Sequence, residues 1–362
     1  MSSKTTKYRV IVWGTGYVGK MVLRDLIGHP LFELVGVIVA NPDKDGVDVG
    51  TLVGRDPIGL TCSTDIDEVL SREADAVAHF GPTAAHPGVN IKSAIRSMRA
   101  GKHWVSTAMT PWVYPPICGP GEIDSVVAVC EETGKSCFTT GIDPGFANDL
   151  FPMTLMGLCG RVDSVRIQEI LDYATYSGDY APMGFGQGPD ESALLEHPDI
   201  LIYSWGRTIP MIADAIGVEL EKIDTVWEKW FATEDIPYPY GVIEAGTVGA
   251  VRFEIRGWVD GEPRIIVEHC NRITNDAAPD WPRAASADND CYRVIIEGSP
   301  NITQETLFRD EFSGDANAGG CLSTGMRAVN AIPAICALDR PGMLSPLDLP
   351  LVPGRGTMRS AG

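Results

Sequence analysis

The sequence predicts an α/β protein: a doubly wound parallel sheet, then an α+β domain with a mixed or antiparallel sheet. Three observations lead to this fold class. A short apolar run at residues 10–13 enters a glycine-rich turn and then an amphipathic stretch. Similar short runs alternate with helical patterns over the first 140 residues. After about Asn148, longer strands with alternating polarity replace them.

The glycine-rich turn has the pattern GxGxxG. The order of strand, glycine turn and helix is the one that holds a dinucleotide pyrophosphate at a helix N-terminus. Gly14 allows the tight turn, Gly16 lets the backbone approach the phosphates, and Gly19 lets the helix lie close to the strand. We therefore expect a Rossmann-type domain whose cofactor site includes the whole motif: Gly14, Thr15, Gly16, Tyr17, Val18 and Gly19.

The other elements of the first domain follow from periodicity. Apolar residues at helical spacing predict a helix over 17–27, which the Gly28-His29-Pro30 group ends. The continuous apolar run 34–39 is typical of a strand that is covered on both faces. Comparable strands are expected at 76–80, 104–107 and 137–140, with helices at 89–98 and 123–132.

The second domain reads as longer strands. Alternating segments predict strands at 165–173 and 220–231, and Asp260-Gly261 joins 251–259 to 262–273 in a hairpin. A helix over 319–337, kinked or reset at Pro333, is expected to return to the first domain. We expect a dinucleotide-binding domain at 1–147, completed by 315–345, and a substrate and dimerisation domain at 148–314.

Composition excludes several classes of partner. The 362 residues carry 29 Lys and Arg against 48 Asp and Glu, a net charge of −19, so nucleic acid and anionic membranes are poor partners. Nine cysteines with no CxxC pair indicate reduced thiols rather than a disulfide framework or a metal site. No apolar run is long enough to cross a bilayer, and polar residues 2–7 run straight into the first strand, so we expect a cytoplasmic protein.

The end of the second strand bears on the choice of coenzyme. The position where an acidic residue usually binds the ribose of NAD holds no carboxylate. Asn41 and Lys44 are suited to a phosphate, which favours NADP(H), whereas Asp43 could serve NAD(H) instead. After a later strand, Phe80, Gly81 and Thr83 are expected near the nicotinamide half, although Gly81-Pro82 could be a plain turn.

The glycine motif at 14–19, the segment 39–44 and the segment 140–149, which contains Gly-Ile-Asp-Pro-Gly-Phe at 141–146, resemble one known family. It is the 2,4-diaminopentanoate dehydrogenase and native amine dehydrogenase family, which is built like dihydrodipicolinate reductase. The resemblance continues through 160–163, 169–176, 183–186 and 328–334, and so covers nearly the whole chain. It implies a nicotinamide-dependent oxidoreductase with two domains, closed by the last helix and commonly a homodimer.

One feature of the family is missing. Family amine dehydrogenases carry a Glu just after the strand at 104–107, which holds the amine and handles protons. Here Met109 or Thr110 stands in its place, and neither side chain can pair with an ammonium as a carboxylate does. We therefore do not carry over oxidative deamination, and expect hydride transfer to or from a carbonyl or imine carbon with another proton donor.

Three residues are candidates for that proton donor. In a hairpin with a two-residue loop, His269 would face Arg252 on the more polar face of the sheet; it could equally be a solvent or dimer-interface histidine. Tyr173 lies in a segment that the family places around the substrate, although aromatic packing is the alternative. Asp143 follows a strand end, where it could instead stabilise a turn.

The expected substrate pocket is largely apolar, which favours a hydrophobic ketone, aldehyde or imine. Its expected lining is Met109, Trp112, Phe146, Tyr173, Tyr176, Met183, Phe185 and His269. Two other interpretations stay open: a non-enzymatic NADP(H) sensor or scaffold, and a sugar-type oxidoreductase, of whose Glu-Lys-Pro motif only Pro111 remains.

Overall fold

The computed structural model describes residues 7–82, 86–176, 178, 181–285, 289–350, 352 and 355. Contacts divide the chain into two compact units, Met1–Gly141 with Cys321–Gly362 (unit 1) and Ile142–Gly320 (unit 2). The domain boundaries expected at 147/148 and 314/315 stay a prediction. No helix of the described part is long and apolar enough to span a membrane, and all nine cysteines are free thiols.

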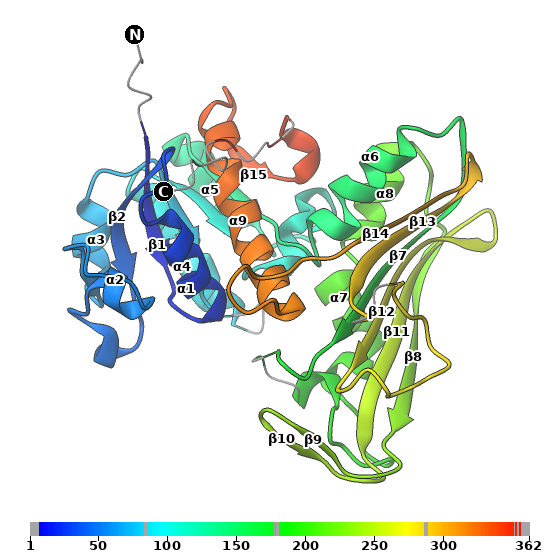
Figure 1. The fold of residues 1–362 in the computed structure, drawn as a ribbon. Helices are drawn as coiled ribbons and strands as arrows, with labels where there is room; N and C mark the ends of the chain where they lie inside the picture. Colours follow the sequence, from blue (N-terminus) through cyan, green and yellow to red (C-terminus); the bar gives the residue numbers. More distant parts are fainter. Residues whose placement is uncertain are drawn as a thin grey trace. The chain divides into compact units, whose positions relative to one another are not determined.

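Unit 1 contains a seven-stranded sheet in which every strand pair is parallel (Figure 1). The strand order is β15-β6-β5-β4-β1-β2-β3. From β1 the chain adds β2 and β3 on one side of the sheet and then β4, β5 and β6 on the other, as in a doubly wound fold. The strands are β1 (Tyr8–Trp13), β2 (Phe32–Ile38), β3 (Cys62–Ser63), β4 (Ala76–His79), β5 (His103–Ser106), β6 (Ser136–Thr139) and β15 (Gly342–Leu344). This arrangement confirms the predicted fold class of the first domain.

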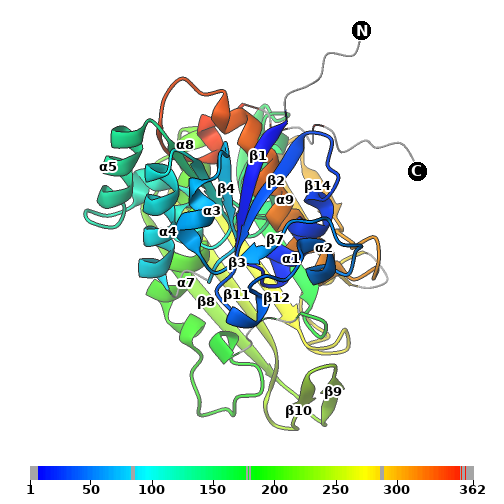
Figure 2. The same cartoon turned by 90° about the vertical axis from the view of Figure 1, so that its left-hand side faces the viewer.

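Helices cover both faces of this sheet (Figure 2). Val10 and Val12 pack with α1 (Tyr17–Leu26) and α9 (Ala316–Cys336). Ile11 points to the other face because side chains alternate along a strand. Ile11 packs with α3 (Ile66–Ser71), α4 (Pro87–Arg99) and α5 (Asp124–Thr133). The remaining short helix of this part, α2, spans Val49–Leu52.

Helix α9 returns to unit 1 as predicted. Val329 and Ile332 share the core of β1 and α1. A Cβ at Gly325 would lie only 2.3 Å from Val22 Cγ2, so the glycine lets α9 approach α1. The helix does not restart at Pro333 but continues to Cys336, so the predicted reset is wrong. Pro333 has no N–H for the carbonyl of Val329, but only three residues of the helix follow it.

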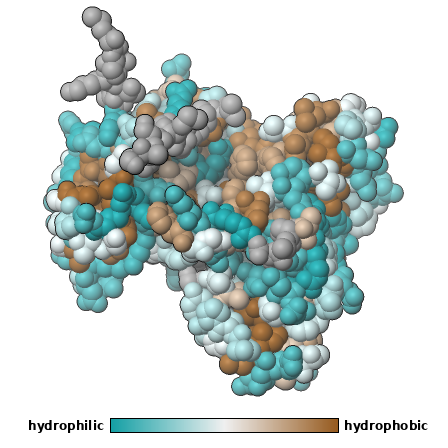
Figure 3. Space-filling model, in the orientation of Figure 1, coloured by the Kyte–Doolittle hydropathy of each residue, from teal (hydrophilic) through white to brown (hydrophobic). Residues whose placement is uncertain are grey.

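Unit 2 is built on a six-stranded mixed sheet of order β14-β13-β7-β12-β11-β8, in which β7 and β12 are parallel and the other neighbours antiparallel. The strands are β7 (Arg161–Asp172), β8 (Lys222–Phe231), β11 (Val248–Val259), β12 (Glu262–Arg272), β13 (Cys291–Ser299) and β14 (Ile302–Thr306). A separate hairpin pairs β9 (Ile236–Tyr238) with β10 (Gly241–Ile243). Figure 3 shows apolar side chains over this hairpin at the lower end of the view, where Val242 is 54% exposed.

Three helices pack on one face of the mixed sheet: α6 (Leu150–Met156), α7 (Pro198–Trp205) and α8 (Thr208–Ile216) (Figure 1). Ile167, Phe253 and Val267 are among the strand residues of this core. Single 3-10 turns complete the chain: Pro42–Lys44, Thr110–Val113, Pro115–Ile117, Phe146–Asn148, Ala181–Met183, Leu194–Glu196 and Pro346–Asp348.

The register of the predicted hairpin differs from expectation by one residue. An irregularity between Gly257 and Trp258 shifts the pairing, so that His269 pairs with Phe253 and not with Arg252. Because a one-residue shift moves every side chain to the opposite face, the predicted polar position of His269 is wrong. The ring instead lies on the helix-covered apolar face, stacked on Phe253 at 4.4 Å between ring centroids.

The opposite face of the mixed sheet carries a network of charges. Arg252 contacts Glu268 at 2.7 Å and Glu254 at 3.0 Å, and Arg166 contacts Glu254 at 2.7 Å. Glu268 also accepts from Gln168 at 2.8 Å. Of the described residues, loop side chains such as Ala277 and Ala284 pack on one end of this face. The opposite end, among Arg166, Ile266 and Ile295, forms a hollow of about 760 Å³.

Candidate functional site

The glycine motif of unit 1 has the geometry that the sequence predicts. Gly14 has φ of +103°, and a Cβ there would lie 2.5 Å from the Phe80 carbonyl oxygen. A Cβ at Gly19 would lie 2.0 Å from the Gly14 oxygen, so neither position tolerates a side chain. A Cβ at Gly16 would meet no atom within 4 Å. This open backbone fits the approach of a pyrophosphate.

Helix α1 begins directly after Gly16, which offers no side chain to its first N–H groups, and the first turn holds no acidic residue. These donors suit an anion. Lys44 brings a positive charge to the glycine turn: its Nζ donates to Thr15 O at 2.9 Å and to Thr15 Oγ1 at 3.1 Å. Asn41 accepts from the Asp43 backbone N–H at 2.9 Å, and the Asp43 side chain is exposed.

The strand end predicted to lie near the nicotinamide is described only in part. Phe80 is buried and its N–H donates to Trp13 O at 2.7 Å, which joins β4 to the end of β1. A Cβ at Gly81 would come within 2.5 Å of His79 Nε2, so close packing explains this glycine. Thr83 lies outside the described residues.

The predicted pocket residues fall into two sets. Met109 and Trp112 are each 1% exposed and belong to a core of unit 1 that includes Val77 and Trp104. In unit 2, Tyr173 lies beside Tyr176 and Phe185, at 5.1 and 6.4 Å between ring centroids. Phe146 stacks on Phe151 at 5.5 Å, and Met183 is buried in the main core of the unit. That these side chains line one pocket stays a prediction.

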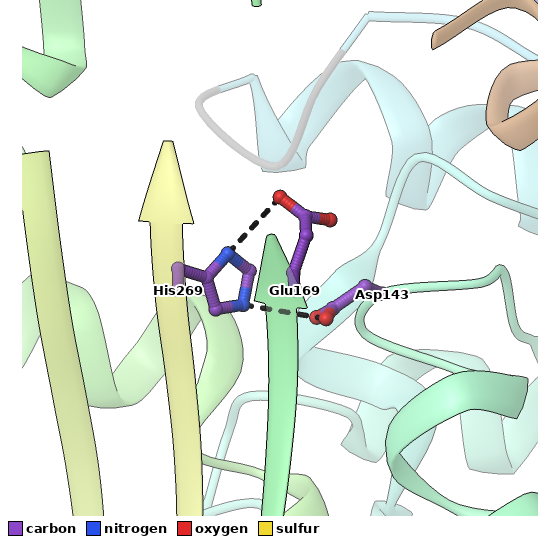
Figure 4. A group of neighbouring side chains, drawn as sticks. All are labelled: Asp143, Glu169 and His269. Carbon is purple, nitrogen blue, oxygen red and sulfur yellow. Dashed lines mark ion pairs between the residues drawn. The ribbon is translucent and has the colours of Figure 1, made fainter. Parts of the chain in front are cut away.

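The three predicted proton-handling residues come together in unit 2, joined by a fourth residue, Glu169. Figure 4 shows Asp143, Glu169 and His269 of this group. His269 Nε2 lies 3.3 Å from Asp143 Oδ2, and His269 Nδ1 lies 3.2 Å from Glu169 Oε1. The Tyr173 hydroxyl donates to Glu169 Oε1 at 2.8 Å. Asp143, Glu169 and His269 form what we call the buried triad, with side chains no more than 6% exposed.

The register of the sheet positions the triad. Glu169 and His269 are partners across the parallel strands β7 and β12, so their side chains leave the same face side by side. Asp143 arrives from the loop after β6, where Asn148 Nδ2 donates to its Oδ1 at 2.6 Å. Asn148 in turn accepts from the Gly145 N–H at 2.8 Å. Asp143 thus accepts at Oδ1 from a residue of its own loop, Asn148, as in the turn-stabilising alternative, while its Oδ2 faces His269.

Glu169 was missed in the sequence. It interrupts an apolar face, because Val165, Ile167 and Leu171 at the same alternation are all buried. A lone carboxylate in such a row needs a partner, since burying an unpaired charge is costly. That interruption, and the matching one of His269 after Ile265 and Val267, was the available signal.

The two carboxylates do not have equal support. Glu169 Oε1 accepts from Tyr173 and also from Asn271 Nδ2 at 2.9 Å. Asp143 Oδ2 has the imidazole at ion-pair distance but no aligned hydrogen bond, and neither does the ring at either nitrogen. Glu169 is therefore the better satisfied carboxylate, and Asp143 Oδ2 keeps an unused acceptor.

Charge sets the protonation of the triad. Burial disfavours the imidazolium, but Asp143 and Glu169 outweigh it and raise the pKa of His269 to about 10. Burial likewise opposes the charge of Glu169, yet His269 and its hydrogen bonds hold the pKa of that carboxyl below its usual value. For Asp143 burial prevails, and its pKa is raised. Burial also raises the pKa of Tyr173.

A cation of another kind could also use these donors. The triad is a set of His and carboxylate ligands whose donor atoms lie within 4.8 Å of one another, which a divalent metal could exploit. However, a metal ion would bind one ring nitrogen of a neutral imidazole. Here each ring nitrogen faces a different carboxylate, which is the arrangement of an imidazolium with two ion pairs.

Comparison with known proteins places the chain. Residues 146–359 match the model of the 2,4-diaminopentanoate dehydrogenase C-terminal domain, and residues 8–106 match that of the dihydrodipicolinate reductase N-terminus. An amine dehydrogenase of Streptomyces virginiae is 38% identical over 96% of this chain and 98% of its own length. The 2,4-diaminopentanoate dehydrogenase of Acetoanaerobium sticklandii is 26% identical over 95% of this chain and 94% of its own.

A solved structure supports the same fold. Amine dehydrogenase from Mycobacterium smegmatis superposes with a TM-score of 0.77 at 20% identity, covering 98% of this chain and 99% of that one. A structure described as a putative myo-inositol dehydrogenase from Sinorhizobium meliloti superposes with a TM-score of 0.51 at 17% identity, covering 91% of this chain and 88% of that one. The chain therefore belongs to the 2,4-diaminopentanoate dehydrogenase family, and it is an NAD(P)-dependent oxidoreductase.

Proposed function

We propose that this oxidoreductase interconverts a small, mostly apolar amine with the corresponding imine or carbonyl compound. The observation that carries the proposal is the buried triad, which holds two carboxylates against one imidazolium. Tyr173, Tyr176 and Phe185 add aromatic surface beside it. Such a setting suits a cationic nitrogen attached to an apolar group. The relatives named amine dehydrogenase and 2,4-diaminopentanoate dehydrogenase support the same chemistry.

The coenzyme would be held by the glycine motif, with its pyrophosphate at Gly16 and the N-terminus of α1. A bound nicotinamide accepts or supplies the hydride. We propose NADP(H) as the preferred coenzyme for two reasons. Lys44 contacts the glycine turn at Thr15, and residues 39–44, which follow β2, include no carboxylate other than the exposed Asp43. Use of NAD(H) through Asp43 is the alternative.

The chain's own residues would handle the proton. We propose His269, Tyr173 and Asp143 as the group that orients the substrate nitrogen and balances its charge. Glu169 links them, because it contacts His269 and accepts from Tyr173. These buried contacts exclude water, and electrostatic interactions are stronger where water is excluded.

The test is reductive turnover. Purified protein is given NADPH and a panel of apolar ketones and aldehydes, with and without ammonia, and oxidation of the coenzyme is followed by absorbance. Turnover that requires ammonia supports the proposal. Equal turnover without ammonia would instead indicate carbonyl reduction, and saturable coenzyme binding with no turnover would favour a sensor or scaffold.

We also propose that the chain forms a homodimer through the charged face of the mixed sheet. Loop side chains such as Ala277 and Ala284 pack on one end of this face, whereas the helices α6–α8 cover the other face. Its alternating Arg and Glu side chains are self-complementary in charge. Ile266 and Ile295 provide apolar contact in the hollow at one end of this face. Light scattering after size-exclusion chromatography gives the mass directly.

A further inference from the structure

The three members of the buried triad differ in how fully their contacts fix them. His269 has a carboxylate at ion-pair distance from each ring nitrogen, so both carboxylates favour the doubly protonated, charged ring. Its ring is also fixed from the side, stacked on Phe253 and edge-on to Trp205 at 5.6 Å between centroids. A ring held in this way is a fixed cation and a poor donor of its proton.

Glu169 is equally committed. Its Oε1 lies within reach of His269 Nδ1, the Tyr173 hydroxyl and Asn271 Nδ2. Two hydrogen bonds, from Tyr173 and Asn271, and the ion pair with His269 stabilise its charge and fix its orientation. Glu169 is therefore unsuited to receive a proton or to turn toward a substrate.

Asp143 differs from Glu169 in both respects. Among the described residues, the aligned hydrogen bond to Asp143 comes from Asn148 at Oδ1, while Oδ2 lies 3.3 Å from His269 Nε2 without an aligned bond. The charged groups that act on Asp143 are His269 and Glu169, so the triad carries one negative charge in excess when both carboxylates are ionised. A buried excess charge is removed either by a proton or by a cation from outside.

We propose that Asp143 binds the nitrogen of the substrate and takes its proton, and that His269 and Glu169 are positioning residues that hold Asp143 in place. Asp143 would thus supply the carboxylate that the family resemblance places after β5, where this chain has Met109. The inference rests on the proposed function, since it names the nitrogen-binding residue of that same site.

The proton step balances in atoms and charge. The N–H bond of a substrate ammonium breaks with its electron pair left on nitrogen, and an O–H bond forms at Asp143 Oδ2. A cation and a carboxylate become a neutral amine and a neutral carboxyl group. The amine lone pair is then available for a C=N bond, and a bound nicotinamide would supply the acceptor for the hydride of the neighbouring carbon. His269 keeps both protons throughout.

Binding without turnover tests this assignment. The probes are tert-butylammonium, which has no hydrogen on the carbon beside nitrogen and cannot be oxidised, and its neutral isostere tert-butanol. Each is titrated by ligand NMR into the full chain, as wild type and as Asp143→Asn. We expect the wild type to prefer the cation at least tenfold and Asp143→Asn to lose that preference. Asp163→Asn, which removes an exposed carboxylate paired with Arg161 in the same unit, serves as the control and should keep it.

The outcomes separate this inference from the proposed function. An unchanged cation preference in Asp143→Asn overturns the role of Asp143, even if ammonia-dependent turnover is observed. No cation preference in the wild type also overturns it, and turnover of ketones without ammonia would then show that the proposed function has failed as well. If Asp143→Asn does not fold, Asp143→Glu takes its place. That variant keeps the charge but moves it by one methylene, so an unaltered affinity for the cation would contradict the assignment.

The positioning roles have their own readout. Glu169→Gln leaves His269 with a single carboxylate, Asp143, among the charged groups that face it from β7, β12 and the loop after β6. We expect the ring, silent in a histidine NMR titration of the wild type between pH 6 and 9, to titrate within this range in the variant, and the pH profile of turnover to shift with it. A purely structural role would leave the pH profile in place.

Discussion

The charge state of His269 makes a quantitative prediction about stability. The double substitution Asp143→Asn and Glu169→Gln keeps the shape of both side chains but removes both charges that face the ring. Burial alone then acts on His269 and favours the neutral imidazole. Wild type and variant therefore differ in whether the folded chain holds a proton on this ring at neutral and mildly alkaline pH.

The magnitude follows from the two pKa values of His269. The ring has a pKa of about 10 in the folded chain and about 6.5 when unfolded. Because the folded value is the higher one, its contribution to stability is complete below about pH 6.5 and is lost as the pH rises toward 10. Between about pH 7 and 8.5 the folded state binds nearly one proton more than the unfolded state, so the free energy of unfolding falls by about 2 kcal/mol. The double variant should lack this slope.

Urea denaturation followed by tryptophan fluorescence, at several pH values in this window, measures the slope. Buried thiols such as Cys130, whose pKa is raised to about 11 by burial, add their own dependence at the alkaline end, but they are common to both proteins. The difference between the two slopes therefore isolates the triad. Equal slopes in wild type and variant would refute the imidazolium and with it the division of roles in the triad.

Four further outcomes are expected. Gly16→Leu should weaken coenzyme binding at least tenfold without unfolding the chain, since no atom lies within 4 Å of the new Cβ; unchanged affinity in calorimetry would contradict the pyrophosphate site. Lys44→Ala should weaken NADPH about tenfold more than NADH, because a charge-assisted bond contributes about 1.5–3 kcal/mol, and equal losses would remove the basis for NADP preference. Tyr173→Phe removes a donor to buried Glu169 and should cost about 1–3 kcal/mol in urea denaturation, so an unchanged midpoint would show that this bond is unimportant. Ile295→Asp should yield monomers in light scattering if the charged sheet face is the dimer interface, and a dimer that survives would place the interface elsewhere.

Local patterns were enough to predict the cofactor-binding fold. The apolar run before Gly14, the spacing of the glycines and the alternation of short strands with helices depend on residues close in sequence. Their geometry in the structure agrees, from the positive φ of Gly14 to the core of β1 between two helix layers. The family resemblance rests on the same local segments and was confirmed by the comparisons.

The register of the long hairpin could not be predicted in the same way. The Asp260-Gly261 turn was placed correctly, but the irregularity at Gly257 and Trp258 shifts every pair beyond it. A single extra residue in one strand leaves the apolar alternation intact on each side, so nothing local reveals it. His269 was therefore assigned to the wrong face of the sheet, and its part in the chemistry stays a prediction.

The triad itself needed long-range information. Asp143 and His269 are 126 positions apart in the printed sequence, and Glu169 meets His269 only because β7 and β12 are parallel neighbours in a sheet of non-sequential order. Asp143, Tyr173 and His269 were each predicted as proton-handling residues from their local sequence context. What joins them is the carboxylate of Glu169, whose only local trace is a charge in a row of buried apolar residues.

The most direct test of the account is the ammonia-dependent oxidation of NADPH with an apolar ketone, compared between wild type and Asp143→Asn. Positioned proton transfer contributes about 10²–10⁴-fold to rate. We expect the variant to lose at least 100-fold in kcat/KM while its affinity for NADPH is unchanged. A variant that keeps the wild-type rate, or a wild type that reduces the ketone equally well without ammonia, would contradict the account.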